Sequence, residues 1–176
     1  PFTPFYLREL GVTDALELRR WSGMVMAGPP LSMVVFAPIW GLVADRFGRR
    51  LMVVRAMFGG AVVLSLMGCV ATPGQLLACR VLQGALTGTI SAMLALVASV
   101  TPRERTGYAL GMMQAAVAFG FAIGPWIGGH LAAVFGYRGT FLAAGLFLLT
   151  GGVLVLLFAK ERFERHVHSV EAPSTF

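Results

Sequence analysis

Five long apolar runs follow one another along the chain, separated by short polar stretches. They cover approximately residues 21–42, 51–70, 75–98, 108–132 and 139–159. Each is close to the roughly 20 residues that a helix needs to cross about 30 Å of hydrocarbon. The runs are apolar all round, whereas the strands of a transmembrane barrel alternate over about 10 residues. The pattern therefore predicts an all-α membrane protein with five visible transmembrane helices.

The connections between the runs are short and contain turn-forming residues. These are Pro73 and Gly74, Pro102, and Gly136, within residues 71–74, 101–106 and 135–138. Loops of this length predict antiparallel neighbouring helices, so residues 21–159 form one bundle. We interpret residues 1–20 as the outer end of a mostly missing first span followed by an external loop. Residues 160–176 are predicted to be a polar cytoplasmic tail that begins the central loop.

Arginine and lysine residues beside the runs predict the orientation of the bundle. The net charge is +6, but the cations lie in short clusters at the ends of the runs, which argues against nucleic acid as a partner. Eight lie on the side of the 43–50 loop: Arg46, Arg49, Arg50, Arg103, Arg105, Lys160, Arg162 and Arg165. Four lie on the other side: Arg8, Arg19, Arg20 and Arg138. The positive-inside rule therefore places the loop and the tail in the cytoplasm and residues 1–20 outside.

Composition supports a membrane protein and excludes several other classes. Hydrophobic residues make up 57% of the chain and charged residues 12%, with a mean hydropathy of +0.77, which leaves too little polar surface for a soluble domain. Two cysteines and three histidines form neither a disulfide framework nor a metal cluster. The tryptophans Trp21, Trp40 and Trp126 include interface anchors. Without a phosphate-binding GxxxxGK(S/T) sequence, the chain is predicted not to be powered by ATP. Because it shows no paired acids, metal cluster or activated nucleophile, it is predicted not to be an enzyme.

The charged segment GLVADRFGRR at residues 41–50 predicts a tight hairpin between two helices. Its candidate functional residues are Gly41, Asp45, Arg46, Gly48, Arg49 and Arg50. Gly41 lets a helix end approach its neighbour closely, while Asp45 and Arg49 can pair at one helical turn or reach a partner helix. Positive-inside topology alone would explain the arginines, but not the glycines or the single acid.

Arg80 is interpreted as the only charge clearly inside a span, where an ionisable group is costly enough to be a functional candidate. Gln83 and Gly84 lie one turn further along the same helix face. Snorkelling is the alternative, because Arg80 starts only about 8 Å from the Gln75 end of its run and its guanidinium can reach the interface. None of the five runs contains a mid-membrane Asp or Glu.

A glycine and proline motif occupies the run at 108–132: Gly120, Gly124, Pro125, Gly128 and Gly129. A glycine at every fourth position predicts a groove of bare backbone along one helix face, and the proline favours a kink. Small-residue stripes are also common helix contacts in any membrane protein. Gln114 in the same run is a candidate for the substrate cavity, with an amide bonded to a neighbouring helix as the alternative.

These three motifs, in this order and spacing, resemble the major facilitator superfamily of secondary transporters. Residues 41–50 are similar to its signature GxxxD(R/K)xG(R/K)(R/K) between the second and third spans. Arg80, Gln83 and Gly84 are similar to its fourth-span motif. Residues 120–129, GFAIGPWIGG, resemble the fifth-span motif of proton-coupled exporters. The resemblance covers nearly all of residues 1–165 and is strongest to drug:proton antiporters.

The resemblance implies the N-terminal half of a major facilitator fold in a bacterial cytoplasmic membrane. A small-molecule substrate would bind between this half and a missing C-terminal half. The 41–50 segment would latch the halves in the outward-facing state, and Arg80 would tune the protonation of an acid in the missing first span. The glycine motif would seal against proton leak and bend as access alternates. The proton gradient, and no cofactor or metal, would supply the energy.

The function favoured by this resemblance is proton-coupled efflux of drugs or small amphipathic compounds by alternating access. Two alternatives stay open. The same fold can act as an importer or as a sugar or metabolite exporter. The chain can also be a non-transporting membrane half-protein or an assembly partner that dimerises through the glycine stripe.

Overall fold

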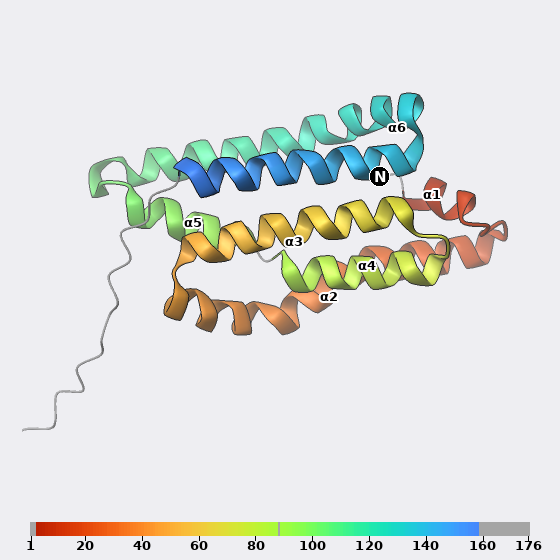
Figure 1. The fold of residues 1–176 in the computed structure, drawn as a ribbon, viewed down its shortest axis with the longest axis horizontal. Helices are drawn as coiled ribbons and strands as arrows, with labels where there is room; N and C mark the ends of the chain where they lie inside the picture. The colour runs from red at the N-terminus through yellow and green to blue at the C-terminus, as the bar shows by residue number, and fades with distance from the viewer. Residues whose placement is uncertain (1–2, 88, 159–176) are drawn as a thin grey trace, which may run out of the picture.

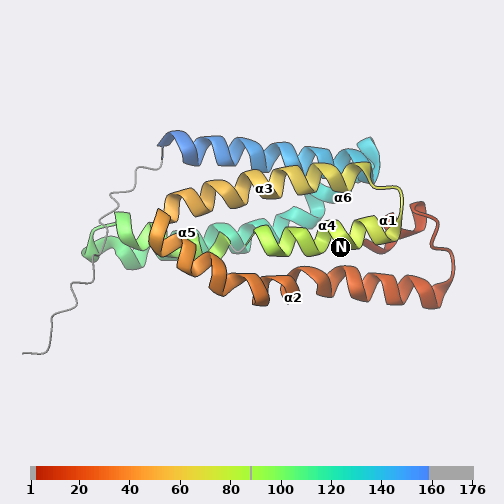
Figure 2. The same ribbon diagram turned by 60° about the horizontal axis from the view of Figure 1, so that its bottom comes forward.

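The computed structural model describes residues 3–87 and 89–158, without the side chains of residues 45, 49 and 89–92. Within these ranges the chain forms helices and no strand, and the long helices lie side by side in one bundle (Figure 1, Figure 2). In chain order they are α1 (Thr3–Glu9), α2 (Ala15–Phe47), α3 (Arg49–Cys69), α4 (Pro73–Leu86), α5 (Thr89–Val100), the 3₁₀ helix η1 (Arg103–Arg105) and α6 (Thr106–Phe158). The prediction of an all-α fold is confirmed. The predicted tail at 160–176 lies outside the described residues.

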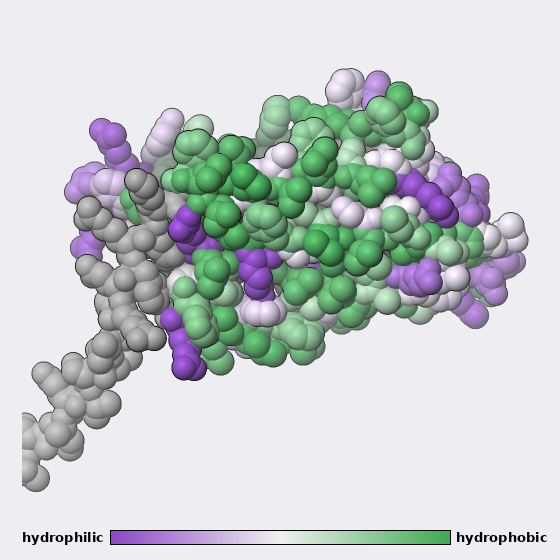
Figure 3. All heavy atoms as spheres, viewed as in Figure 1, coloured by the Kyte–Doolittle hydropathy of each residue, from purple (hydrophilic) through white to green (hydrophobic). Residues whose placement is uncertain are grey.

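The connections gather at the two ends of the bundle. The α2–α3 turn, the α5–α6 connection and the last turn of α6 lie at one end, which we call the hairpin end (Figure 1). Helix α1, the α3–α4 connection and a reversal within α6 lie at the other, which we call the distal end. Hydrophilic residues concentrate near the two ends, and apolar side chains cover most of the surface between them (Figure 3). This distribution suits a bundle whose middle lies in hydrocarbon.

Helix α2 begins at Ala15, earlier than the apolar run that predicts it. The side chain of Asp14 causes this early start, since its Oδ2 accepts hydrogen bonds from the backbone N–H groups of Leu16 and Glu17, both at 2.9 Å. Such a cap satisfies donors that have no partner within the helix. Part of the segment expected as an external loop is therefore the first turn of α2.

The apolar run at 75–98, predicted as one helix, consists of two helices. Helix α4 ends at Leu86, and Thr87 caps it with φ −101° and ψ 15°, while its N–H and its hydroxyl both donate to the carbonyl oxygen of Gln83, at 2.9 and 2.6 Å. A β-branched residue with a backbone-bonding hydroxyl, followed in the sequence by Gly88, has low helix propensity. The expectation of a continuous helix is wrong here, although α5 continues from α4 toward the hairpin end (Figure 1).

Helix α6 contains two helices that reverse direction at Gly136. This residue has φ 70° and ψ 175°, a conformation that L side chains rarely adopt and that glycine adopts at little cost. The N-terminal part (residues 106–135) and the C-terminal part (residues 137–158) consequently run in opposite directions (Figure 1). The reversal lies where the sequence places a short connection.

In the described part of the chain, three helical segments are long and apolar enough to cross a membrane: Ala15–Ala44, Arg50–Cys69 and Arg103–Phe158. The last supplies two crossings because it reverses within α6. Helices α4 and α5 have 14 and 12 residues, or about 21 and 18 Å, so neither alone crosses about 30 Å of hydrocarbon. Together they take the place of the remaining predicted span.

A cluster of buried residues lies at the distal end, where α1 packs against the bundle. Tyr6 and Leu7 of α1 are fully buried together with Met67 of α3 and Leu76 of α4. The Tyr6 hydroxyl donates to the carbonyl oxygen of Met67 at 2.8 Å. Helix α1 is therefore an integral part of the bundle.

Candidate functional site

The hairpin between α2 and α3 turns on one residue, Gly48. Helix α2 ends at Phe47, α3 begins at Arg49, and Gly48 between them has φ 94° and ψ 149°. A side chain at this φ would be strained, so the turn requires glycine. Gly48 is buried, and its N–H donates to the carbonyl oxygen of Ala44 at 2.9 Å. The predicted tight hairpin is what the structure shows.

The described arginines of the hairpin bind groups at the hairpin end of the bundle. The Arg46 guanidinium lies 5.6 Å from the ring centroid of Phe47. Arg50 donates from Nη2 to the carbonyl oxygen of Leu156, in the last turn of α6. Carbonyls in the last turn of a helix lack intrahelical partners and favour a nearby cation. Arg50 thus ties the start of α3 to the end of α6.

Two further hairpin predictions stay untested by the geometry. The side chains of Asp45 and Arg49 lie outside the described part of the structure, so their pairing stays a prediction. At Gly41, no described atom lies within 4 Å of the position that a Cβ would take. Any helix that approaches Gly41 closely must come from outside the described residues.

Arg80 and Gln83 form a polar pair inside α4. Nη1 of Arg80 donates to Oε1 of Gln83 at 3.1 Å, and the guanidinium carbon lies 6.0 Å from the ring centroid of Phe141 in α6. Nε of Arg80 is buried and has no hydrogen-bond partner among the described residues, which is costly. The Arg80 guanidinium thus contacts Gln83 of its own helix and faces Phe141 of α6, and these contacts leave both the inward role and snorkelling as untested predictions.

Gly84, the third residue of this motif, lies at the contact between α4 and α2. A Cβ at Gly84 would lie 2.1 Å from the carbonyl oxygen of Pro29 and 2.2 Å from Oγ of Ser32. Glycine is therefore required for the two helices to approach this closely. Gly84 has a packing role that is separate from any role in transport.

The glycine motif of α6 faces open space in the described part of the protein. Nothing lies within 4 Å of the Cβ position at Gly120 or Gly124, and both residues are exposed. Gly128 and Gly129 are half-buried, and Gln114 is exposed. The groove of bare backbone stays a prediction, since no described helix contacts Gly120 or Gly124.

Close helix packing through glycine occurs instead between α3 and the C-terminal part of α6. A Cβ at Gly145 would lie 2.5 Å from Oγ of Ser65, and one at Gly68 would lie 2.9 Å from the carbonyl oxygen of Arg138. The sequence analysis did not single out these glycines. Neither is part of a regular stripe, so nothing in their spacing distinguished them from the other glycines of the chain.

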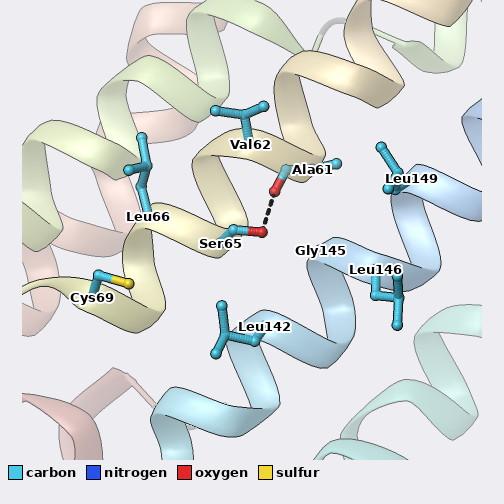
Figure 4. A pocket seen from close by; sticks show the side chains of 9 residues that line it. All are labelled: Ala61, Val62, Ser65, Leu66, Cys69, Leu142, Gly145, Leu146 and Leu149. Carbon is cyan, nitrogen blue, oxygen red and sulfur yellow. Dashed lines mark hydrogen bonds between the residues drawn. The ribbon is translucent and has the colours of Figure 1, made fainter.

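An apolar groove of about 510 Å³ lies along this α3–α6 contact (Figure 4). Residues 61–69 of α3 and 142–149 of α6 supply its lining. The hydroxyl of Ser65 is already engaged, since it donates to the carbonyl oxygen of Ala61 at 2.9 Å. The groove contains none of the predicted site residues and offers apolar contact only.

The prediction that Arg80 is the only charge clearly inside a span is wrong, because Arg55 lies within α3. Its Nη2 donates to the carbonyl oxygen of Leu86, the last residue of α4, at 3.1 Å. Its guanidinium carbon lies 3.3 Å from the ring centroid of Trp40 in α2. A sequence signal was present, since Arg55 interrupts the apolar run at 51–70.

The three motifs do not meet in one pocket of the described chain. The hairpin lies at one end of the bundle, Arg80 lies within α4 beside α6, and the glycine motif lies on an uncovered face. A family model described as Major Facilitator Superfamily matches residues 1–175. The chain belongs to the Major Facilitator Superfamily. The resemblance seen in the motifs is therefore confirmed.

The curated relatives of the chain carry names that refer to multidrug resistance. Over 93% of its length the chain is 43% identical to the multidrug resistance protein MdtG of Serratia proteamaculans, covering 40% of that protein. It is 39% identical to MdtG of Citrobacter koseri over 93% of its length, covering 40% of that protein. It is 36% identical to the multi-drug resistance efflux pump PmrA of Streptococcus pneumoniae, again over 93% of its length and covering 41% of PmrA. The chain thus spans about two fifths of the length of these curated relatives.

Membership of the Major Facilitator Superfamily settles the class of the protein. It is an integral membrane protein of a transporter superfamily and not an enzyme. The uncovered glycine face and the dispersed motifs suit a fold in which the pathway lies between two related halves.

Proposed function

We propose that the protein containing this chain exports drugs or small amphipathic compounds, driven by the proton gradient, by alternating access. The observation that carries this proposal is Arg80: a cation inside a span, bonded to Gln83, with a buried Nε that has no partner among the described residues. Intramembrane ionisable groups of this kind mark ion and proton pathways. The relatives that share this part of the chain are named a multidrug resistance protein and a multi-drug resistance efflux pump.

The proton carrier is expected outside this chain. The described residues form no ion pair with Arg80, and none of the five apolar runs contains a central Asp or Glu. The acid that Arg80 influences should belong to the first span, with the substrate bound between this half and a C-terminal half. Since the energy comes from the proton gradient, the protein needs no cofactor or metal.

We further propose that the protein lies in the bacterial cytoplasmic membrane with the hairpin end facing the cytoplasm. The arginine and lysine count around the runs, eight against four, supports this orientation. The first residues of the chain would then lie outside and its last residues in the cytoplasm.

Expression of the complete reading frame in a bacterium without its own multidrug pumps tests export. Cells that carry it should tolerate more of at least one amphipathic cation and should expel preloaded ethidium faster than cells with an empty vector. An importer or metabolite exporter would leave both measurements unchanged while accumulating or releasing another solute. A non-transporting half-protein would change no flux at all.

Asp45→Asn should slow ethidium efflux about tenfold while leaving the amount of inserted protein unchanged. The reason is that a charge-assisted contact at the hairpin, worth about 1.5–3 kcal/mol, would be weakened in one of the two access states. Efflux rates normalised to membrane protein measure the effect. Glu104→Gln, which removes an exposed acid in η1 at the same end, serves as the control. Normal efflux by Asp45→Asn would rule out the latch.

Gly124→Leu should eliminate efflux while this half of the protein still folds. The Cβ position at Gly124 meets open space in this chain, so the larger side chain can block only a helix from elsewhere. Gly111→Leu, in the same part of α6 and equally unobstructed, is the matched control. Limited proteolysis of the inserted protein, together with ethidium efflux, would separate the two effects. Robust drug resistance with Gly124→Leu would contradict the proposed role of the glycine motif.

A further inference from the structure

The carbonyl groups at the end of α4 lie in an unusual place. Helix α4 ends at Leu86, after 14 residues, which is about 21 Å from its start and therefore within the thickness of the hydrocarbon. The last carbonyls of a helix lack intrahelical partners, and hydrocarbon offers no water to replace them. Groups from other helices must satisfy them.

Two side chains bind these carbonyls, one from α3 and one from α2. Arg55 donates from Nη2 to the carbonyl oxygen of Leu86 at 3.1 Å, and Trp40 donates from Nε1 to the carbonyl oxygen of Ala85 at 2.6 Å. The Arg55 guanidinium also stacks on the Trp40 ring, 3.3 Å from its centroid. The three helices are thus joined at one point by two hydrogen bonds and one cation–π contact.

We propose that Arg55 and Trp40 are positioning residues that cap α4 inside the membrane and hold the Arg80–Gln83 pair in place while the protein changes access state. On the same helix, Gln83 lies less than one turn and Arg80 about one and a half turns before the capped carbonyls. With α4 fixed to α2 and α3, the three helices move as one body. The link between a fixed α4 and the rate of efflux rests on the proposed function.

The chemistry of Arg55 favours this role over simple packing. Its Nε and Nη1 are buried without hydrogen-bond partners among the described residues, so the residue is held at a cost that an apolar side chain would avoid. A planar guanidinium can stack on an indole and donate sideways to a carbonyl at the same time. A lysine ammonium can donate to Leu86 but cannot form the flat stack.

Spin-label distances in the purified protein from the complete reading frame test the cap. On a background without other cysteines, labels at Leu42 and Leu82 report the α2–α4 contact, and labels at Val62 and Leu146 report the α3–α6 contact as a control. All four side chains are at least 45% exposed. Arg55→Met and Trp40→Phe should shift or broaden the first distance by about 1–2 Å and leave the second unchanged. Arg55→Lys should restore part of the wild-type distribution.

Ethidium efflux by the same variants tests positioning. Arg55→Met should lower the maximal rate about tenfold while the half-saturating concentration stays within about twofold. Trp40→Phe keeps an aromatic ring beside Arg55 but removes the Nε1–H donor, so it should lower the maximal efflux rate less than Arg55→Met. Arg103→Met, an exposed arginine of η1, is the control and should leave the rate unchanged.

Each outcome decides a separate step. Unchanged α2–α4 distances, or equal changes in both label pairs, would overturn the cap. If the Arg55 and Trp40 variants change the α2–α4 distance but export ethidium at the wild-type rate, the proposal that these residues position Arg80 for transport is overturned. If the wild-type protein expels no ethidium or other amphipathic cation, the proposed function fails, and the distances still decide whether Arg55 and Trp40 cap α4.

Discussion

Gly84→Ala is expected to destabilise the protein by about 3 kcal/mol or more and to reduce the yield of folded protein severalfold. The added methyl group would lie 2.1 Å from the carbonyl oxygen of Pro29, so the backbones of α2 and α4 would have to separate. Overpacking in a well-packed core usually costs about 1–3 kcal/mol, and contact with backbone leaves little room for relaxation. The yield and thermal unfolding midpoint of detergent-purified protein, followed by size-exclusion fluorescence, measure the effect.

Gly74→Ala is the matched control on the same helix. Its Cβ would meet nothing within 4 Å, and alanine favours a helix over glycine by about 1 kcal/mol. It should therefore be neutral or slightly stabilising. If the two alanine variants have the same midpoint, the close α2–α4 contact at Gly84 does not exist in the membrane.

Substitution of Arg80 is expected to reduce transport strongly. Arg80→Ala removes the charge and leaves Oε1 of Gln83 without its donor. Arg80→Lys keeps the charge but loses the planar fork that reaches Gln83 while facing Phe141. We expect Arg80→Ala to lower the ethidium efflux rate about a hundredfold, and Arg80→Lys at least tenfold, with normal insertion.

The measurement should include proton movement, since loss of efflux alone does not show loss of coupling. A pH-sensitive dye inside membrane vesicles would report proton release when ethidium is added, and the signal should disappear in both Arg80 variants. Arg19→Ala, an exposed arginine of α2, is the control. Proton-driven efflux that survives both Arg80→Lys and Arg80→Ala would remove Arg80 from the coupling mechanism.

The spans and the hairpin could be predicted because hydrophobic length and charge are local properties of the sequence. Gly48 was identifiable from its place between two helices, and Gly136 from its place between two apolar runs. The break after Leu86 was not predictable in the same way. Thr87 and its neighbours lie within an apolar run, and hydropathy does not register a hydroxyl that bonds to the backbone.

The contact residues could not be predicted because they depend on which helix faces meet. Gly84 and Gly124 are both glycines in apolar runs with family motifs, yet one touches α2 and the other meets open space. Arg55 was overlooked in favour of Arg80, although both lie in apolar runs. Its role became visible only when α4 was found to end beside it.

The motifs gain a common physical meaning from this arrangement. Arg50 and Arg55 each bind a carbonyl at the end of another helix, α6 and α4 respectively. Gly84 sets the distance between α2 and α4. These contacts join the described helices into one body, and no described residue lies within 4 Å of the Cβ positions at Gly120 and Gly124. A body of this kind can rock against a second half without repacking internally.

Transport by the purified complete protein in liposomes shows whether export is coupled to protons. With ethidium inside and outside at equal concentration, an imposed pH gradient should drive ethidium to the more acidic side, and an ionophore that collapses the gradient should abolish the movement. Proton-coupled export would be contradicted if ethidium movement does not depend on the pH gradient. It would also be contradicted if none of the amphipathic cations tested moves.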